Sequence, residues 1–134
     1  MNDPVVVLDS GVLDRASTDH RFRATLRHLV EGGWSPIIPT VVLAEAVTGG
    51  ARDAPVNHLL RRLGTVTTDD PTARRAGHLR HVAARSGARR PPSGIDAIVA
   101  AHAADEGAGV VFTTDPGDLR RLLDGHPHIR VERP

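Results

Sequence analysis

A run of four apolar side chains, Val5–Leu8, constrains the fold of this chain more than any other feature. The run lacks the alternation of apolar and polar residues that a strand with one face in water shows. Pro4 and Asp9 bound it on either side. A short run of this kind is typical of a strand buried on both faces inside a parallel sheet. We therefore expect a sheet that is covered by helices.

Short apolar strands alternate with helical patterns along the rest of the chain. Strands separated by helices indicate βαβ units with right-handed crossovers, and hence a parallel sheet. We expect an α/β fold of three layers, α/β/α, with a central parallel sheet of about four or five strands, forming one domain over residues 1–134. Further strands are expected at 34–38, 65–68 (a weak one), 110–113 and 128–131, and helices at about 19–31, 40–47, 54–63, 70–86, 93–106 and 116–123.

Composition limits which residues can form the core and which kinds of site the chain can have. Aromatic residues make up 2% of the chain, so aliphatic side chains and Ala must form the core, and the absence of Cys excludes thiolate metal sites. No apolar run approaches the roughly 20 residues of a membrane span, which makes a cytoplasmic protein without membrane contact the default expectation. All 17 basic residues are Arg, and those between Asp70 and Asp96 form a stretch without acids. Such a stretch suits phosphate binding, although a solvated helix face explains it equally well.

Two acidic residues follow expected strands. Ligands of open parallel sheets bind beyond the carboxyl ends of the strands. Asp9 directly follows Val5–Leu8, and Asp115 follows the strand at 110–113 after one residue. If those strands are neighbours, both carboxylates lie at one edge of the sheet. Each acid also has a structural interpretation, because Asp9 can cap the next turn and Asp115, before Pro116, is typical of a helix start.

Two further acids lie within expected helices. Glu45 has mostly apolar neighbours over 41–47, so we expect its carboxylate to be at least partly desolvated, which is costly unless a cation or hydrogen bonds compensate. An exposed Glu on a helix whose other faces pack is the alternative. Asp96 completes a Ser93-x-x-Asp96 capping box at a helix start, where the helix dipole also favours an anion or a metal-bound phosphate.

Hydrolysis of a phosphodiester would require these four acids to lie close together. The reaction needs an activated water and neutralised phosphoryl oxygens, which a pair of hard cations about 4 Å apart supplies. Carboxylates are the ligands that such cations prefer. Without metal, four clustered carboxylates would repel one another and raise one another's pKa values. We therefore expect a metal site formed by Asp9, Glu45, Asp96 and Asp115.

Four stretches of the sequence resemble the signature stretches of PIN domains, in the same order and spacing as in VapC-type toxins of bacterial toxin–antitoxin pairs. They are VVVLDS at 5–10, LAEA at 43–46, GIDAIVAA at 94–101 and VFTTDPGDL at 111–119. The resemblance covers essentially the whole chain. It implies a PIN-like fold and a magnesium- or manganese-dependent endoribonuclease toxin that inhibits translation and growth. It also implies a small cognate VapB-like antitoxin that covers the acidic groove, and a homodimer.

The resemblance assigns roles to individual residues. Asp9, Glu45 and Asp96 match the three core acids, and Asp115 matches a fourth position that varies between Asp and Asn, so all four are expected to be catalytic and to bind metal. Asp118 matches an additional acidic position that acts through water.

Other positions supply hydroxyl groups near the metal or candidate contacts to RNA. Ser10 and Thr114 occupy positions where the family often has a hydroxyl near the metal, whereas Gly11 and Leu119 depart from the usual residues, which affects specificity rather than activity. Because few aromatic side chains can stack on bases, we expect recognition through RNA shape and phosphates. The candidate RNA contacts are Arg85, Arg89 and Arg90.

Other classes of protein fit the sequence less well. A receiver domain and a P-loop protein each need a Lys, which this chain lacks, and a haloacid dehalogenase phosphatase needs Asp-x-Asp where position 11 is Gly. The closely spaced His pairs, 78/81 and 126/128, lack a further ligand for zinc at a fitting distance. The remaining alternative is a catalytically silent PIN-like binding or scaffold module.

Overall fold

The computed structural model describes residues 3–85 and 90–134, and its centre is a four-stranded parallel sheet. The strands are β1 (Val5–Leu8), β2 (Ser35–Ile37), β3 (Val110–Phe112) and β4 (Arg130–Glu132), in the order β2-β1-β3-β4. The predicted parallel sheet is confirmed. The strand expected at 65–68 is wrong, because only Val66 pairs, as an isolated bridge to Pro39. Polar threonines surround Val66, so the segment has too few apolar residues to form a strand of the core.

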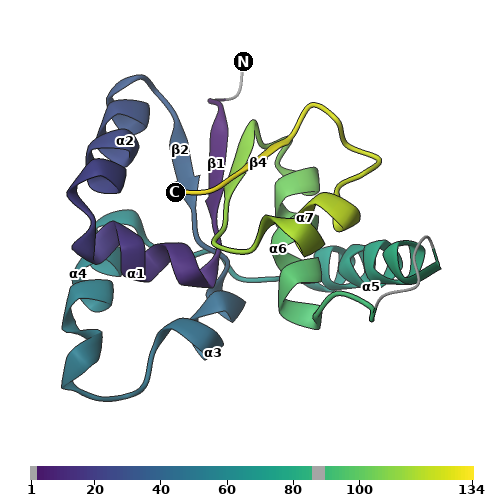
Figure 1. Ribbon diagram of the computed structural model, residues 1–134, viewed down its shortest axis with the longest axis horizontal. Coiled ribbons are helices and arrows are strands. Elements are labelled where there is room, and N and C mark those ends of the chain that lie inside the picture. The colour runs from purple at the N-terminus through teal and green to yellow at the C-terminus, as the bar shows by residue number, and fades with distance from the viewer. Residues whose placement is uncertain (1–2, 86–89) are drawn as a thin grey trace.

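Helices gather on both sides of the sheet and give the predicted three layers (Figure 1). On one side lie α1 (Ser10–Thr18), α2 (His20–Glu31), α3 (Leu43–Ala46) and α4 (Ala54–Leu63). On the other side lie α5 (Asp70–Arg85), α6 (Gly94–Asp105) and α7 (Pro116–Leu122). Two short 3-10 turns, η1 (Thr40–Val42) and η2 (Ala51–Asp53), precede α3 and α4. None of the helices in the described part of the chain is both long and apolar enough to cross a bilayer.

Two helical segments differ from the sequence-based expectation. Helix α1 was not predicted, and it begins directly at the end of β1 with Asp9 as its N-cap. Asp19 ends α1 and begins α2, because its carboxylate accepts hydrogen bonds from the backbone N–H groups of Arg21 and Phe22. The single helix expected at 40–47 is divided into η1 and the one-turn helix α3.

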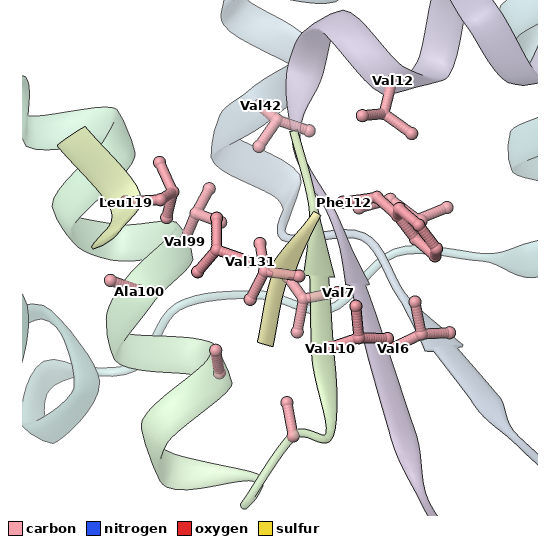
Figure 2. Packing of buried hydrophobic residues seen from close by; sticks show 14 of the residues in the cluster. Val6, Val7, Val12, Val42, Val99, Ala100, Val110, Phe112, Leu119 and Val131 are labelled. Carbon is pink, nitrogen blue, oxygen red and sulfur yellow. The ribbon is translucent and has the colours of Figure 1, made fainter. Parts of the chain in front are cut away.

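The core is aliphatic, as the composition predicted. Every residue of β1 is buried, and consecutive side chains point to opposite faces of the sheet. Val7 and Val131 lie toward Val99 on α6, whereas Val6 and Val110 lie on the opposite face (Figure 2). The aromatic exception is a pair, in which the rings of Phe22 and Phe112 meet edge to face with centroids 5.0 Å apart.

The strand order has a switch point between β1 and β3. From the central β1, the chain goes first to β2 on one side and later to β3 on the other, so the direction of strand addition reverses there. Ligands of open α/β sheets bind at such a switch point, beyond the carboxyl ends of the strands. The two strands remain paired at that end, where the Asp9 backbone N–H donates to the carbonyl of Phe112 at 3.1 Å. The fold thus brings the residues after β1 and β3 together.

Candidate active site

The carboxylate of Asp9 is fixed at the switch point. It is 6% exposed, and its Oδ1 accepts a hydrogen bond from the backbone N–H of Ser10 at 2.7 Å. Its Oδ2 accepts from the hydroxyl of Thr113 at 2.8 Å. The same Thr113 oxygen accepts from the backbone N–H of Asp115 at 3.1 Å. One fully buried hydroxyl therefore joins the acid after β1 to the loop after β3.

Thr113 was missed by the sequence analysis, which named Thr114 as the hydroxyl of this loop. The available signal was a hydroxyl residue that ends an apolar run directly before Thr-Asp. The Thr114 side chain is exposed and lies against Gly11, where an added Cβ would be 2.3 Å from its Oγ1. The missing side chain at position 11 therefore lets the loop after β3 approach the first turn of α1. This close approach explains why Gly occupies position 11, where the sequence departs from the usual residue of PIN domains.

Glu45 reaches the site from α3. The expectation of a partly desolvated carboxylate is wrong, because Glu45 is exposed. Helix α3 has a single turn, so the apolar neighbours of Glu45 in the sequence pack against the core without surrounding its side chain. Its Oε1 accepts a hydrogen bond from the hydroxyl of Ser10 at 3.1 Å. Since Ser10 directly follows Asp9, this contact places Glu45 near the first acid.

Asp96 faces the other acids from the first turn of α6. Its backbone N–H donates to the hydroxyl of Ser93 at 3.1 Å, which confirms the predicted helix cap. Burial, and then the negative charges of Asp9 and Asp118, raise the pKa of Asp96 from 3.8 to about 6, and the charge of Glu45 adds to this. Burial removes hydration from the carboxylate, and like charges disfavour its ionisation. The carboxylates of three further acids are therefore close enough to be felt at Asp96.

Asp115 and Asp118 lie at the start of α7. Asp115 is the N-cap residue, but its side chain makes no capping hydrogen bond and is exposed. The helix start therefore does not engage the Asp115 carboxylate, and the backbone link through Thr113 holds this residue beside Asp9. Asp118 lies three positions further on and accepts a hydrogen bond from Nη1 of Arg121 at 3.2 Å. Of these two acids, Asp118 is the one whose charge raises the pKa of Asp96, although sequence reasoning had given Asp118 the lesser role.

Three arginines of the cationic stretch already have partners within the protein. Arg74 pairs with Asp70 at 2.7 Å, Arg75 pairs with Asp105, and Nε of Arg80 donates to the carbonyl of Pro92 at 2.7 Å. All three residues are nevertheless exposed, and only the hydrogen bond of Arg80 joins α5 to the loop before α6.

The three candidate RNA contacts fall at the end of this stretch. Arg85 and Arg90 are exposed, while Arg89 lies outside the described residues. Arg90 lines a cavity of about 600 Å³ together with Pro91, Ser93, Asp118 and Arg121.

The acids fit a hard divalent cation in donor type and in charge. All are carboxylates, and the pKa of Asp96 is raised by burial and by neighbouring negative charges, which a cation would offset. Among the described residues, no three His, Cys, Asp or Glu side chains are already grouped closely enough to hold an ion. Binding would therefore require the carboxylates to draw together around the metal.

Chains of several solved assemblies share this fold. A chain of VapBC2 from Rickettsia felis, bound to a DNA fragment from their promoter, superposes with a TM-score of 0.76 at 20% identity, over 96% of this chain and 98% of that one. A chain of FitAB bound to the IR36 DNA fragment gives 0.71 at 18%, over 96% and 94%. A chain of VapBC-1 from nontypeable Haemophilus influenzae gives 0.72 at 14%, over 96% and 97%. No curated protein matches the sequence.

The solved structures show the fold, and a family model shows the family to which the chain belongs. The model of the PIN domain matches residues 6–122. That span includes β2, β3, all of β1 but its first residue, and every acid of the site. PIN-domain proteins are nucleases that generally use a divalent metal. The chain belongs to the PIN domain family.

Proposed function

We propose that this protein is a metal-dependent endoribonuclease that acts as the toxin of a toxin–antitoxin pair. It hydrolyses RNA phosphodiester bonds and thereby inhibits translation and growth. The observation that carries the proposal is the convergence of acids beyond the strand ends, where Thr113 joins Asp9 to Asp115 and Ser10 joins Asp9 to Glu45. Burial and the charges of Asp9, Asp118 and Glu45 raise the pKa of Asp96 at the same place. The similarity of the fold to chains of VapBC and FitAB assemblies supports the toxin assignment.

The acids hold the metal in this proposal. Asp9, Glu45, Asp96 and Asp115 would bind Mg²⁺ or Mn²⁺, with Asp118 acting through water. When bound, such ions neutralise charge on the phosphoryl oxygens and lower the pKa of water.

Hydroxyl groups of the chain orient these carboxylates. Thr113 fixes one oxygen of Asp9 and leaves the other oxygen turned toward the start of α1. Ser10 orients Glu45. Thr114, whose side chain is exposed beside Gly11, provides a further hydroxyl at the same edge.

Substrate and partners follow from the same proposal. Arg85, Arg89 and Arg90 would hold the RNA backbone before it reaches Asp96, because cationic side chains bind phosphates whatever the base sequence. A small VapB-like antitoxin would cover the acidic edge and so block access of RNA. The single chain over residues 1–134 would act as one domain and pair as a homodimer.

The test compares total RNA incubated with the wild-type protein and with Asp96→Asn, in Mg²⁺, in Mn²⁺ and in a chelator, followed by mapping of the cut ends. Glu106→Gln, an exposed acid at the other end of α6, is the matched control. Cleavage is expected in either metal for the wild type and the control, and to be lost in Asp96→Asn. A wild-type protein that binds Mg²⁺ but leaves every RNA intact would instead be a silent scaffold module.

A further inference from the structure

Two cavities of opposite character flank the acids. The cavity of about 600 Å³ shares Asp118 with the acid site and is lined by Arg90 and Arg121. A second cavity of about 330 Å³ includes Glu45 in its wall, and its charged lining is otherwise two acids, Asp14 and Asp53, and one arginine, Arg52. Asp118 lines the larger cavity and Glu45 lines the smaller one, so the acids of the site border both cavities. The charge asymmetry favours an anionic strand on the Arg90 side.

Arg121 is held in place on the wall of the larger cavity. Its Nη1 donates to the carbonyl of Arg90 at 3.1 Å and to Asp118 at 3.2 Å, and its Nη2 donates to the carbonyl of Ala83 at 3.2 Å. The side chain is 22% exposed. Because these contacts already fix the guanidinium group, it loses little conformational freedom when it binds a further ligand.

The same guanidinium group keeps donors for that ligand. An arginine side chain carries about five N–H donors, and the three hydrogen bonds above use three of them. Among the described residues, none accepts a hydrogen bond from Nε. The N–H of Nε and the second N–H of Nη2 are therefore available, and a phosphate can accept both in the planar arrangement that guanidinium groups favour.

We propose that this cavity binds a phosphate of a nucleic acid strand, adjacent to the phosphodiester that the acids hold. Arg121 is the fixed ligand of that phosphate, and Arg90, whose side chain is exposed while its carbonyl is held by Arg121, is the adaptable one. The subsite sets the path of the strand, which crosses the acids from the cationic cavity. The inference rests on the proposed function and adds a ligand from α7 that the sequence pattern did not indicate.

The test measures binding of a fluorescently labelled oligouridylate by anisotropy over a range of salt concentrations, in a chelator so that no strand is cut. Each lost phosphate contact lowers the slope of log K against log salt by about 0.7 for a single strand. That reduction is expected for Arg90→Ala and for Arg121→Gln, with no change for Arg62→Ala, an exposed arginine of α4. Arg121→Lys keeps the positive charge but lacks the paired N–H donors of the guanidinium group. It should therefore keep the wild-type slope of log K against log salt and bind more weakly.

Oligonucleotides with a single neutral methylphosphonate locate the subsite. When the methylphosphonate replaces the phosphate that Arg121 binds, the oligonucleotide should bind the wild type more weakly. The same oligonucleotide should bind Arg121→Gln as well as the unmodified one does. Arg90→Ala, which leaves the backbone carbonyl intact, keeps the test valid if Arg121→Gln unfolds.

The outcomes separate the subsite from the nuclease. RNA cleavage in Mg²⁺ with unchanged slopes in both arginine variants rejects the subsite alone, whereas reduced slopes without any cleavage reject the nuclease alone. An oligouridylate that does not bind the wild type rejects the subsite, as does equal displacement by oligoglutamate, which would assign the cavity to an acidic protein partner.

Discussion

Replacement of Asp96 by Asn should stabilise the metal-free protein while abolishing its proposed activity. The pKa of Asp96 is raised from 3.8 to about 6, so the folded state holds this proton more tightly than the unfolded state does. Above pH 6 the carboxylate is charged in both states and its cost to the fold is complete. One pKa unit corresponds to about 1.4 kcal/mol, which sets an upper limit of about 3 kcal/mol. Since Asp96 is only partly buried, screening by solvent reduces the expected gain in Asp96→Asn to about 1–2 kcal/mol.

The pH dependence of this gain has a definite sign. As the pH falls from about 6 to below 3.8, Asp96 becomes protonated first in the folded and then in the unfolded state, and its cost to the fold disappears. The gain in Asp96→Asn should therefore be complete near neutral pH and vanish in acid. Urea denaturation in a chelator at both pH values measures it, and Asp124→Asn, an exposed acid beyond α7, is the control.

With added metal, the wild type should become more stable than Asp96→Asn. A ligand that binds only the folded state stabilises it by mass action, so Mn²⁺ should raise the free energy of unfolding of the wild type more than that of Asp96→Asn. If Asp96→Asn is no more stable than the wild type at neutral pH in a chelator, the acids do not converge at this residue. The proposed metal site would then lose its main support.

Three further substitutions test the framework of the site. Thr113→Val should lower the free energy of unfolding by about 1–3 kcal/mol and weaken Mn²⁺ binding measured by calorimetry, with both restored in Thr113→Ser, because the buried hydroxyl has two partners. Gly11→Ala should lower the melting temperature, although a Gly-to-Ala change in a helix ordinarily stabilises, since the added Cβ meets Thr114; the Thr114→Ala background should recover the loss. Hydrogen bonds from Thr48, chiefly its backbone N–H, lower the pKa of Asp53, so Asp53→Asn should lower the melting temperature near neutral pH, and the difference should shrink as the pH falls below 3.8.

Much of the scaffold could be predicted because its signals are local. The buried run Val5–Leu8 and the spacing of the later strands indicated a parallel sheet, which the structure confirms. Helix α1 was missed because nine residues with Gly near the start have little intrinsic helical stability. The helix is stabilised instead by burial of Val12 and Leu13, which depends on tertiary packing.

Features of the site that depend on distant contacts could not be predicted. The identity of the acids was read from strand ends and helix starts, but the exposure of Glu45 follows from the length of α3, which no local pattern sets. Thr113 acquires its role only when its hydroxyl meets Asp9, 104 positions earlier. Arg121 lies outside the cationic stretch in the sequence and joins it only through the packing of α7 against α5 and α6.

The central position of β1 has a consequence for the timing of synthesis. Asp9 is synthesised 104 positions before Thr113, whose hydroxyl orients its carboxylate, and the strand that pairs beside it belongs to residues 110–112. An incomplete nascent chain therefore lacks one wall of the acid site however well its earlier helices have formed. The acid site can therefore assemble only after residue 113 has left the ribosome, so the fold delays any activity of this site until well after Asp9 has been made.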